Sequence, residues 1–402
     1  MDVPLLDSLF IASSAVSTTG LVTVSVFDSY NFGGQFVVMC LFQIGGIGYM
    51  TLTTYFLLRT TNSISRWHSK IIGTEFTMPK TIEIKDFLKS VIVFTLVMEA
   101  LGAISFFIAF KQEGMATLEA VWSSIFHSVS AFCTAGFSLN NDSFIHFQNN
   151  GHINATISIL AIAGSLGFIV VTDIWNRITR KSDSLSFTTK LIFYSFIILL
   201  TLGTVLIYFT EPATEFDGEK SLLTSFFQTM TAMTTVGFNT VDTGALSKPI
   251  IMFIIFLMYL GASPSGTAGG MKITTLIAML SVIWSRITGR KKITFMNRSI
   301  PFERLYVATS TFILYTSIVF FMTFILCFSE SHSLENILFE VASALGTVGL
   351  STGITGDLSV FGKIAITVIM FIGRVGVLTF GFALLARKSK EEPEIIEDDL
   401  AV

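Results

Sequence analysis

Four short segments of the sequence share a threonine two residues before a glycine. They recur at nearly even spacing in the same context, which chance matching would not produce. The segments are Ser17, Thr18, Thr19 and Gly20; Cys133, Thr134, Ala135 and Gly136; Thr234, Thr235, Val236 and Gly237; and Gly346, Thr347, Val348 and Gly349. Glycine adopts dihedral angles that other residues resist, and rings of carbonyl oxygens replace the hydration shell of a cation in selective pores. The pattern therefore predicts four backbone loops around one cation path.

Each of these segments follows an apolar stretch that is too short to cross a membrane. The stretches are Leu5–Val16, Leu118–Phe132, Ser221–Met233 and Ser333–Leu345, and they begin near Asp7, Glu119, Glu219 and Glu335. An acid in the first turn suits a helix N-terminus, and the partially negative C-terminal end of such a half-helix favours a cation. A polar, turn-rich loop and a longer apolar segment follow each glycine. The predicted unit is therefore helix, re-entrant half-helix with loop, and helix.

Composition indicates a membrane protein. The 402 residues are 51% hydrophobic and 13% charged, whereas soluble domains carry about 25% charged residues. Uncharged apolar runs occupy Phe36–Leu58, Ile153–Val171, Leu191–Thr210, Ile250–Gly270, Val307–Ser329 and Ile364–Gly373. All but the last approach the roughly 20 residues that a spanning helix needs. We expect an all-α integral membrane protein with four fused repeats around a pseudo-fourfold pore.

The repeats are predicted at residues 1–60, 86–176, 187–286 and 302–388, followed by an acidic tail at 389–402. Repeat one has no leading helix in this sequence. We expect an upstream helix to be missing, because its absence would expose one quarter of the pore wall to lipid. Most Lys and Arg residues fall within 59–89, 177–190, 286–304 and 387–390, which predicts that these links are cytoplasmic.

Repeat three carries a segment that an ordinary helix would not tolerate. It consists of Gly261, Ala262, Ser263, Pro264, Ser265, Gly266, Thr267, Ala268, Gly269, Gly270, Met271 and Lys272. Its glycines and proline interrupt an apolar helix in mid-membrane, while the second helices of the other repeats carry Gly45–Gly48, Gly164–Gly167 and Gly373–Gly376 at similar offsets. The segment is interpreted as a gate below the filter. The alternative is a packing kink that lets helices approach closely.

Arg374 lies in an apolar stretch at roughly the depth of this gate. A lone arginine there is costly unless it faces water or a partner. We interpret it as a positive barrier under the filter that interacts with the gate. A structural pairing with Asp173 or Glu99 is the alternative. Lys272 is expected to extend toward the cytoplasm, to hold the loop, or both.

Two other functional classes fit the sequence less well. An unrelated ion-coupled secondary transporter also uses broken helices, but in inverted repeats, whereas these four repeats run in the same direction. An enzyme is disfavoured because His68, His127, His146, His152 and His332 are scattered. We expect no transition-metal site, no cofactor and no nucleic-acid partner, since the three cysteines fit no metal spacing and no nucleotide-binding fingerprint occurs.

The four Thr-x-Gly loops, the basic links and the interrupted helix together resemble the Trk/Ktr/HKT superfamily, and within it the KtrB-type membrane subunits. The resemblance covers essentially the whole chain. It implies potassium uptake across the cytoplasmic membrane, because Gly20 stands where sodium-favouring plant members have serine. It also implies a homodimer in membrane lipid and a cytosolic nucleotide-binding ring of the KtrA or TrkA type. A sodium-permeable or sodium-coupled transporter of the same architecture, and sodium as an activator, stay open.

Overall fold

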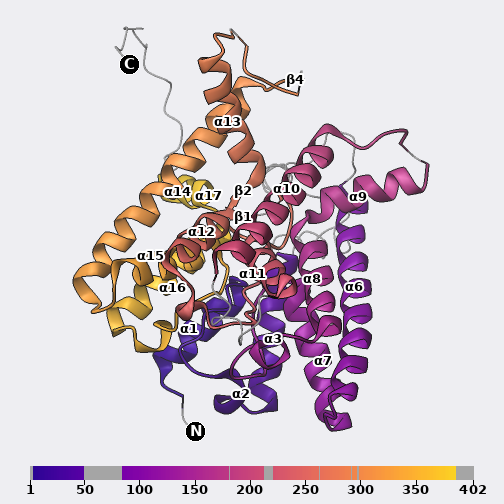
Figure 1. The fold of residues 1–402 in the computed structure, drawn as a ribbon, viewed down its shortest axis with the longest axis vertical. Helices are drawn as coiled ribbons and strands as arrows, with labels where there is room; N and C mark the ends of the chain where they lie inside the picture. The colour runs from indigo at the N-terminus through magenta and orange to yellow at the C-terminus, as the bar shows by residue number, and fades with distance from the viewer. Residues whose placement is uncertain are drawn as a thin grey trace.

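The structure is a computed structural model, and it describes residues 3–48, 84–180, 182–211, 221–261, 263–290, 292–296 and 298–385. The fold is almost entirely helical (Figure 1). Its strands are two short pairs. β1 (Leu260–Gly261) pairs in parallel with β2 (Met271–Lys272), and β3 (Thr294–Phe295) pairs antiparallel with β4 (Arg298–Ser299).

Three long helices supply the apolar outer surface. They are α6 (Ile84–Gln112), α10 (Phe187–Thr210) and α14 (Phe302–Ser329), and each contains a stretch long and apolar enough to cross a membrane. Phe320, Phe321, Phe324 and Phe328 of α14 are exposed. An outward surface of this kind suits hydrocarbon rather than water.

Four short helices precede the Thr-x-Gly segments. They are α1 (Leu5–Val16), α7 (Thr117–Phe132), α11 (Leu222–Thr234) and α15 (Leu334–Gly346). Ser221 and Ser333 cap α11 and α15 through their side chains, which satisfies amides that a helix start leaves free. Asp7, Glu119 and Glu335 lie in first turns as predicted, while Glu219 lies outside the described residues.

The second helices of the repeats are α3 (Phe32–Ile47), α8 (Gly151–Ser165), α12 (Lys248–Tyr259) and α16 (Val360–Val375). Three continuations follow: α9 (Gly167–Ile178), α13 (Ile273–Ile287) and α17 (Val377–Leu385). Short helical turns complete the outer loops at α2 (Val26–Ser29), Ile145–Phe147, Thr243–Ala245 and Thr355–Asp357.

Repeat three is not the only repeat whose second helix is interrupted. The helices of the other repeats also stop, at Gly48, Gly167 and Gly376, whose φ angles are 86°, 83° and 89°. Positive φ is accessible to glycine and ends a helix. The run Ile153–Val171 is therefore not one straight span, because α8 and α9 meet at an angle of 93°.

The first glycine of each Gly-x-x-Gly motif has a different role. A Cβ at Gly45, Gly164 or Gly373 would lie 2.2, 2.1 or 2.2 Å from a carbonyl oxygen near the end of the short helix of the same repeat. Those oxygens belong to Val16, Phe132 and Leu345. Only a residue without a side chain lets the two helices approach so closely.

Three glutamates at the ends of long helices fix the starts of the second helices. Glu113 accepts a hydrogen bond from Asn150 at 2.6 Å, and Glu211 accepts from the Ser247 amide at 2.9 Å. Glu330 accepts from the Ser359 amide at 2.9 Å and from its hydroxyl at 2.6 Å. In each case the donor is the residue that precedes the second helix.

The first and last repeats lie side by side, so the arrangement closes on itself (Figure 1). Lys363 of α16 forms an ion pair with Asp7 of α1 at 2.8 Å, and both side chains are largely shielded from solvent. Contact between α1 and α16 is what a ring of four repeats requires.

Candidate ion pathway and gate

The four Thr-x-Gly segments meet in a closed ring. Each glycine packs against the carbonyl oxygen of the residue that precedes the glycine of the next segment. A Cβ would lie 2.5 Å from Ala135 O at Gly20, 2.5 Å from Val236 O at Gly136, 2.0 Å from Val348 O at Gly237, and 2.2 Å from Thr19 O at Gly349. The last contact returns to the first segment. Real Cβ atoms do not approach backbone this closely, so each glycine is required by its neighbouring segment.

The sign of φ alternates along each segment of the ring. Thr18, Thr134, Thr235 and Thr347 have φ between 48° and 54°, and the four glycines have φ between 69° and 93°. The residue between them does not have a positive φ. Alternation of this kind turns successive peptide groups to the same side. A positive φ is costly for a β-branched residue, and the sequence pattern predicted unusual dihedral angles only at the glycines.

A hydroxyl six residues before each glycine supports the ring, and it was not among the predicted site residues. Ser14 and Ser343 accept hydrogen bonds from the amides of Gly20 and Gly349, both at 3.1 Å. Two further hydroxyls donate to the carbonyl after the glycine: Ser130 to Phe137 at 2.8 Å and Thr231 to Phe238 at 2.6 Å. The signal was present, since serine or threonine occupies this position in all four repeats.

Three of the four segments begin with a residue whose side chain points into the protein, and the fourth begins with Gly346. Ser17 bonds to Ser13 O at 2.7 Å, and Thr234 bonds to Met230 O at 2.7 Å. The Cys133 thiol lies 3.5 Å from Gln43 Oε1 and 3.8 Å from Glu99 Oε1. Glu99 also accepts from Gln43 Nε2 at 3.1 Å. These side chains therefore anchor the segments to the protein that surrounds the ring.

The segment between α12 and α13 fills the break between α8 and α9. Amides of Ser263 and Thr267 donate to the last carbonyls of α8, at Ser165 (3.2 Å) and Gly164 (3.1 Å). In return, the amides of Phe168 and Ile169 at the start of α9 donate to the carbonyl and hydroxyl of Ser265, at 3.2 and 3.3 Å. Helix ends leave such groups without intrahelical partners. The broken helix is thus a fitted receptor for the loop.

The same loop touches three segments of the ring. Thr267 Oγ1 lies 3.1 Å from Thr134 Oγ1 and 3.2 Å from Phe132 O. The amide of Gly269 donates to Thr235 Oγ1 at 3.1 Å. A Cβ at Gly269 would lie 2.0 Å from Thr347 Oγ1, a hydroxyl that has no hydrogen-bond partner in the described part of the chain. The loop therefore lies directly against the ring threonines.

Two basic side chains hold the loop in place. Arg374 donates to the carbonyl of Thr267 at 2.7 Å and also to the carbonyl of Gly45, where the second helix of repeat one ends. Lys272 donates to Ala268 O at 2.6 Å and Gly269 O at 3.3 Å. Asp173 and Glu99 were the alternative partners predicted for Arg374. Asp173 accepts a hydrogen bond from the Ser186 amide at 2.8 Å, and Glu99 accepts one from Gln43 at 3.1 Å.

The other predicted gate residues that the structure describes lie in the same loop. Gly261 pairs with Lys272, and a Cβ at Gly261 would lie 1.8 Å from Gly269 O. Ser265 and Gly270 have φ of 64° and 67°. Gly266 packs against Ser165 O, and Pro264 O faces Gly167. Ala262 lies outside the described residues.

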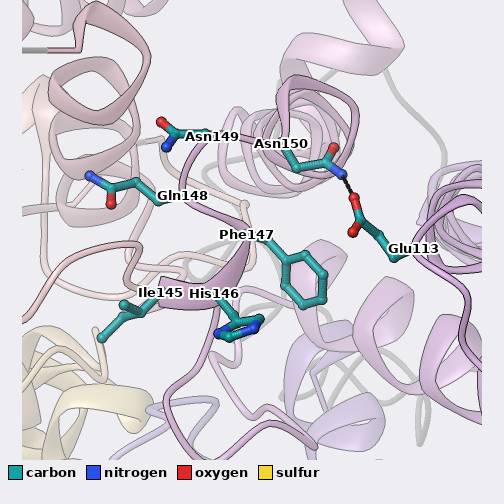
Figure 2. Close-up of a pocket in the computed structure, with 7 residues that line it drawn as sticks. All are labelled: Glu113, Ile145, His146, Phe147, Gln148, Asn149 and Asn150. Carbon is teal, nitrogen blue, oxygen red and sulfur yellow. Dashed lines mark hydrogen bonds between the residues drawn. The ribbon is translucent and has the colours of Figure 1, made fainter. Parts of the chain in front are cut away.

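A cavity in the described structure lies apart from the ring. It has a volume of about 530 Å³ and is lined by Glu113 and by residues 145–150. Figure 2 shows Glu113 hydrogen-bonded to Asn150 at its edge, with His146 and Gln148 on the neighbouring loop. The cavity belongs to the outer loop of repeat two and does not include the ring.

The comparisons with known proteins cover nearly the whole chain. The family model TrkH, described as a cation transport protein, matches residues 1–397. The Ktr system potassium uptake protein B of Vibrio alginolyticus is 32% identical over 396 residues, covering 97% of this chain and 86% of the relative. The potassium/sodium uptake protein NtpJ of Enterococcus hirae is 34% identical, with 96% and 87% covered.

A solved structure shows the same fold. The potassium transporter TrkH from Vibrio parahaemolyticus superposes with a TM-score of 0.74 at 20% sequence identity, covering 96% of this chain and 79% of that one. The resemblance deduced from the sequence is thereby confirmed. The chain belongs to the TrkH/Ktr family of cation transport proteins, which are membrane transporters and not enzymes.

Proposed function

We propose that this chain conducts potassium ions across the cytoplasmic membrane through the ring of Thr-x-Gly segments. The observation that carries the proposal is the closed cycle of contacts from Gly20 to Ala135 and finally from Gly349 to Thr19. Four equivalent loops with aligned peptide groups offer carbonyl oxygens in the arrangement by which cations are selected. The relatives named potassium uptake proteins support potassium as the substrate. The filter consists of residues 17–20, 133–136, 234–237 and 346–349.

The interrupted helix of repeat three acts as the gate in this proposal. The loop from Gly261 to Lys272 lies against the ring threonines, and Arg374 ties its centre to the end of α3. A loop in that position blocks the exit from the filter. It must leave the break between α8 and α9 before an ion can pass. The four repeats at 1–60, 86–176, 187–286 and 302–388 then form the wall.

Regulation is proposed to come from a cytosolic nucleotide-binding subunit, and the chain to pair with a second copy of itself in the membrane. The basic hairpin between α13 and α14 supports the first idea. It projects from the body in Figure 1, and Arg298 stacks on the Phe187 ring at 5.0 Å, which joins the hairpin to the start of α10. In this orientation the basic links face the cytoplasm.

A sodium-permeable pore of the same architecture is the second candidate. The relative NtpJ, named a potassium/sodium uptake protein, favours keeping it. The two candidates differ in one measurable property, the ratio of potassium to sodium flux. Sodium as an activator would instead raise potassium flux without passing itself.

The test is cation flux into liposomes that contain the purified chain, with potassium, rubidium, sodium and lithium compared. Gly237→Ser places a Cβ 2.0 Å from Val348 O. The resulting strain of a few kcal/mol should distort the ring, so we expect the ratio of potassium to sodium flux to fall about tenfold or more. Gly33→Ser is the control, because a Cβ there meets only the Asn31 side chain at 3.5 Å. Equal potassium and sodium flux in the unmodified protein would reject potassium selectivity. No flux of any cation, even with the loop 261–271 deleted, would reject the pore.

A further inference from the structure

Helix α9 does not run in the direction of the long helices. It meets α8 at 93°, and α8 packs against α6 along the same direction (Figure 1). Since α6 is long and apolar enough to cross a membrane, α9 runs along the membrane plane. In Figure 1 it extends outward near the end of α6 that lies away from the outer loops. In the orientation proposed above, this is the cytoplasmic surface of the bilayer.

The two halves of α9 have different surroundings. Phe168, Ile169 and Val170 in the first half are buried. In the second half Trp175 is 61% exposed and Ile178 is 68% exposed, and the exposed Arg177 and Arg180 lie between and beyond them. Tryptophan beside arginine at a helix end is typical of the headgroup layer. An in-plane helix with apolar and basic side chains binds anionic lipid surfaces.

The same short sequence occurs at the end of α13. Ile174-Trp-Asn-Arg-Ile-Thr179 matches Ile283-Trp-Ser-Arg-Ile-Thr288 in five of six positions. Thr179 and Thr288 also bond to the carbonyl of the tryptophan four residues before, at 2.8 and 2.7 Å. Figure 1 shows α13 projecting from the body with β4, so its motif is not carried on an in-plane helix. It therefore provides a matched control of equal charge.

Helix α9 is directly attached to the gate loop. The amides of Phe168 and Ile169, in its buried first turn, hold the carbonyl and hydroxyl of Ser265. Gly167, the preceding residue, has no room for a side chain because Pro264 O would lie 2.7 Å from a Cβ. Anything that fixes α9 in this position therefore stabilises the docked loop.

We propose that the exposed end of α9 binds the phosphate headgroups of anionic phospholipids through Arg177 and Arg180, with Trp175 and Ile178 inserted below them. Binding holds α9 in the membrane plane and so favours the docked gate loop. The chemistry is that of a basic helix on an acidic leaflet, where each arginine contributes to the attraction. The effect on the gate rests on the proposed function, whereas lipid binding by α9 does not.

Binding is tested without transport. Full-length protein is placed in vesicles that contain brominated phosphatidylglycerol or brominated phosphatidylcholine, and tryptophan fluorescence is measured. The signal of Trp175 is the difference between the unmodified protein and Trp175→Phe. We expect brominated phosphatidylglycerol to quench it roughly severalfold more strongly, and the double variant Arg177→Gln, Arg180→Gln to lose this preference. The control Arg286→Gln, Arg290→Gln should keep it. Equal quenching by both lipids, or equal loss in the control, overturns the proposal.

The link to the gate is tested by rubidium flux into vesicles of phosphatidylcholine alone or mixed with phosphatidylglycerol. We expect flux to be roughly fivefold lower in the anionic vesicles, and the double variant on α9 to abolish the difference. Preserved lipid-dependent flux in that variant would overturn the link to the gate. Absence of any flux would instead reject the proposed function, while the quenching result would still decide whether α9 binds lipid.

Discussion

The guanidinium of Arg374 donates a hydrogen bond of 2.7 Å to the carbonyl oxygen of Thr267, at the centre of the loop that lies against the ring. A second bond reaches the carbonyl of Gly45. One side chain from repeat four therefore ties the loop of repeat three to the end of a helix in repeat one. Hydrogen bonds from charged groups contribute about 1.5–3 kcal/mol each. This connection should be a principal restraint on the gate.

Replacing Arg374 by glutamine should therefore open the pathway. We expect rubidium flux in liposomes to rise about tenfold, because a charged bond and a positive charge near the filter are both lost. Arg374→Lys keeps the charge but cannot make two divergent bonds. Its flux should lie between those of the other two proteins. Flux in Arg374→Gln at or below the level of the unmodified protein would contradict a restraining role.

Gly167→Ala should weaken the docking of the gate loop. The new Cβ would meet Pro264 O at 2.7 Å, at a residue whose φ is 83°. Because loop and helix share hydrogen bonds there, we expect flux to rise severalfold, and protease cleavage within the loop to become faster. Gly151→Ala is the matched control on α8, since nothing lies within 4 Å of a Cβ at that position. Equal effects of both variants would mean that the break in α8 is not the receptor.

Ser130→Ala should reduce ion selectivity more than total flux. The variant releases the carbonyl of Phe137, next to Gly136, from a bond of 2.8 Å. A lost hydrogen bond of this kind is equivalent to about 1 kcal/mol, so the ratio of rubidium to sodium flux should fall roughly fivefold. Ser124→Ala is the control on the same helix, because that hydroxyl bonds only within α7, to Ala120 O at 2.5 Å. An unchanged ratio in Ser130→Ala would refute a positioning role.

Glu330 should make the folded protein sensitive to acid. Burial disfavours the charged form, but hydrogen bonds from the Ser359 amide and hydroxyl and from the Ser329 hydroxyl outweigh it, so the pKa is lowered from its ordinary 4.5. A lowered pKa contributes stability that is present above the ordinary value and is lost as the pH falls through the folded-state value.

The measurement is thermal unfolding in detergent as the pH is lowered below about 4.5. Glu330→Gln should lower the free energy of unfolding by about 1–2 kcal/mol at neutral pH and should flatten the loss in acid. Glu335→Gln, which breaks the exposed ion pair with Lys248, should change stability by less than about 1 kcal/mol. Identical acid profiles for Glu330→Gln and the unmodified protein would exclude this carboxylate as the cause.

The sequence by itself determined the units of this protein. Spacing of threonine and glycine marked the four loops, and the helix α1 begins and ends at the predicted residues, Leu5 and Val16. It also located the interrupted helix of repeat three and the family. These features depend on local preferences: apolar length, capping acids, and the dihedral freedom of glycine. They can therefore be predicted from one amino-acid sequence.

Only the tertiary structure decided how the units meet. The motif Gly164–Gly167 was predicted to be part of a spanning helix, but α8 ends within it. The amides and carbonyls that have no partner within a helix at this break form hydrogen bonds with the gate loop. The positive φ of Thr347 likewise cannot be deduced from the sequence, because β-branched residues avoid positive φ. The break after α8 and the φ of Thr347 both depend on partners about 100 positions away in the sequence. The reason is that backbone groups of one repeat contact those of another repeat.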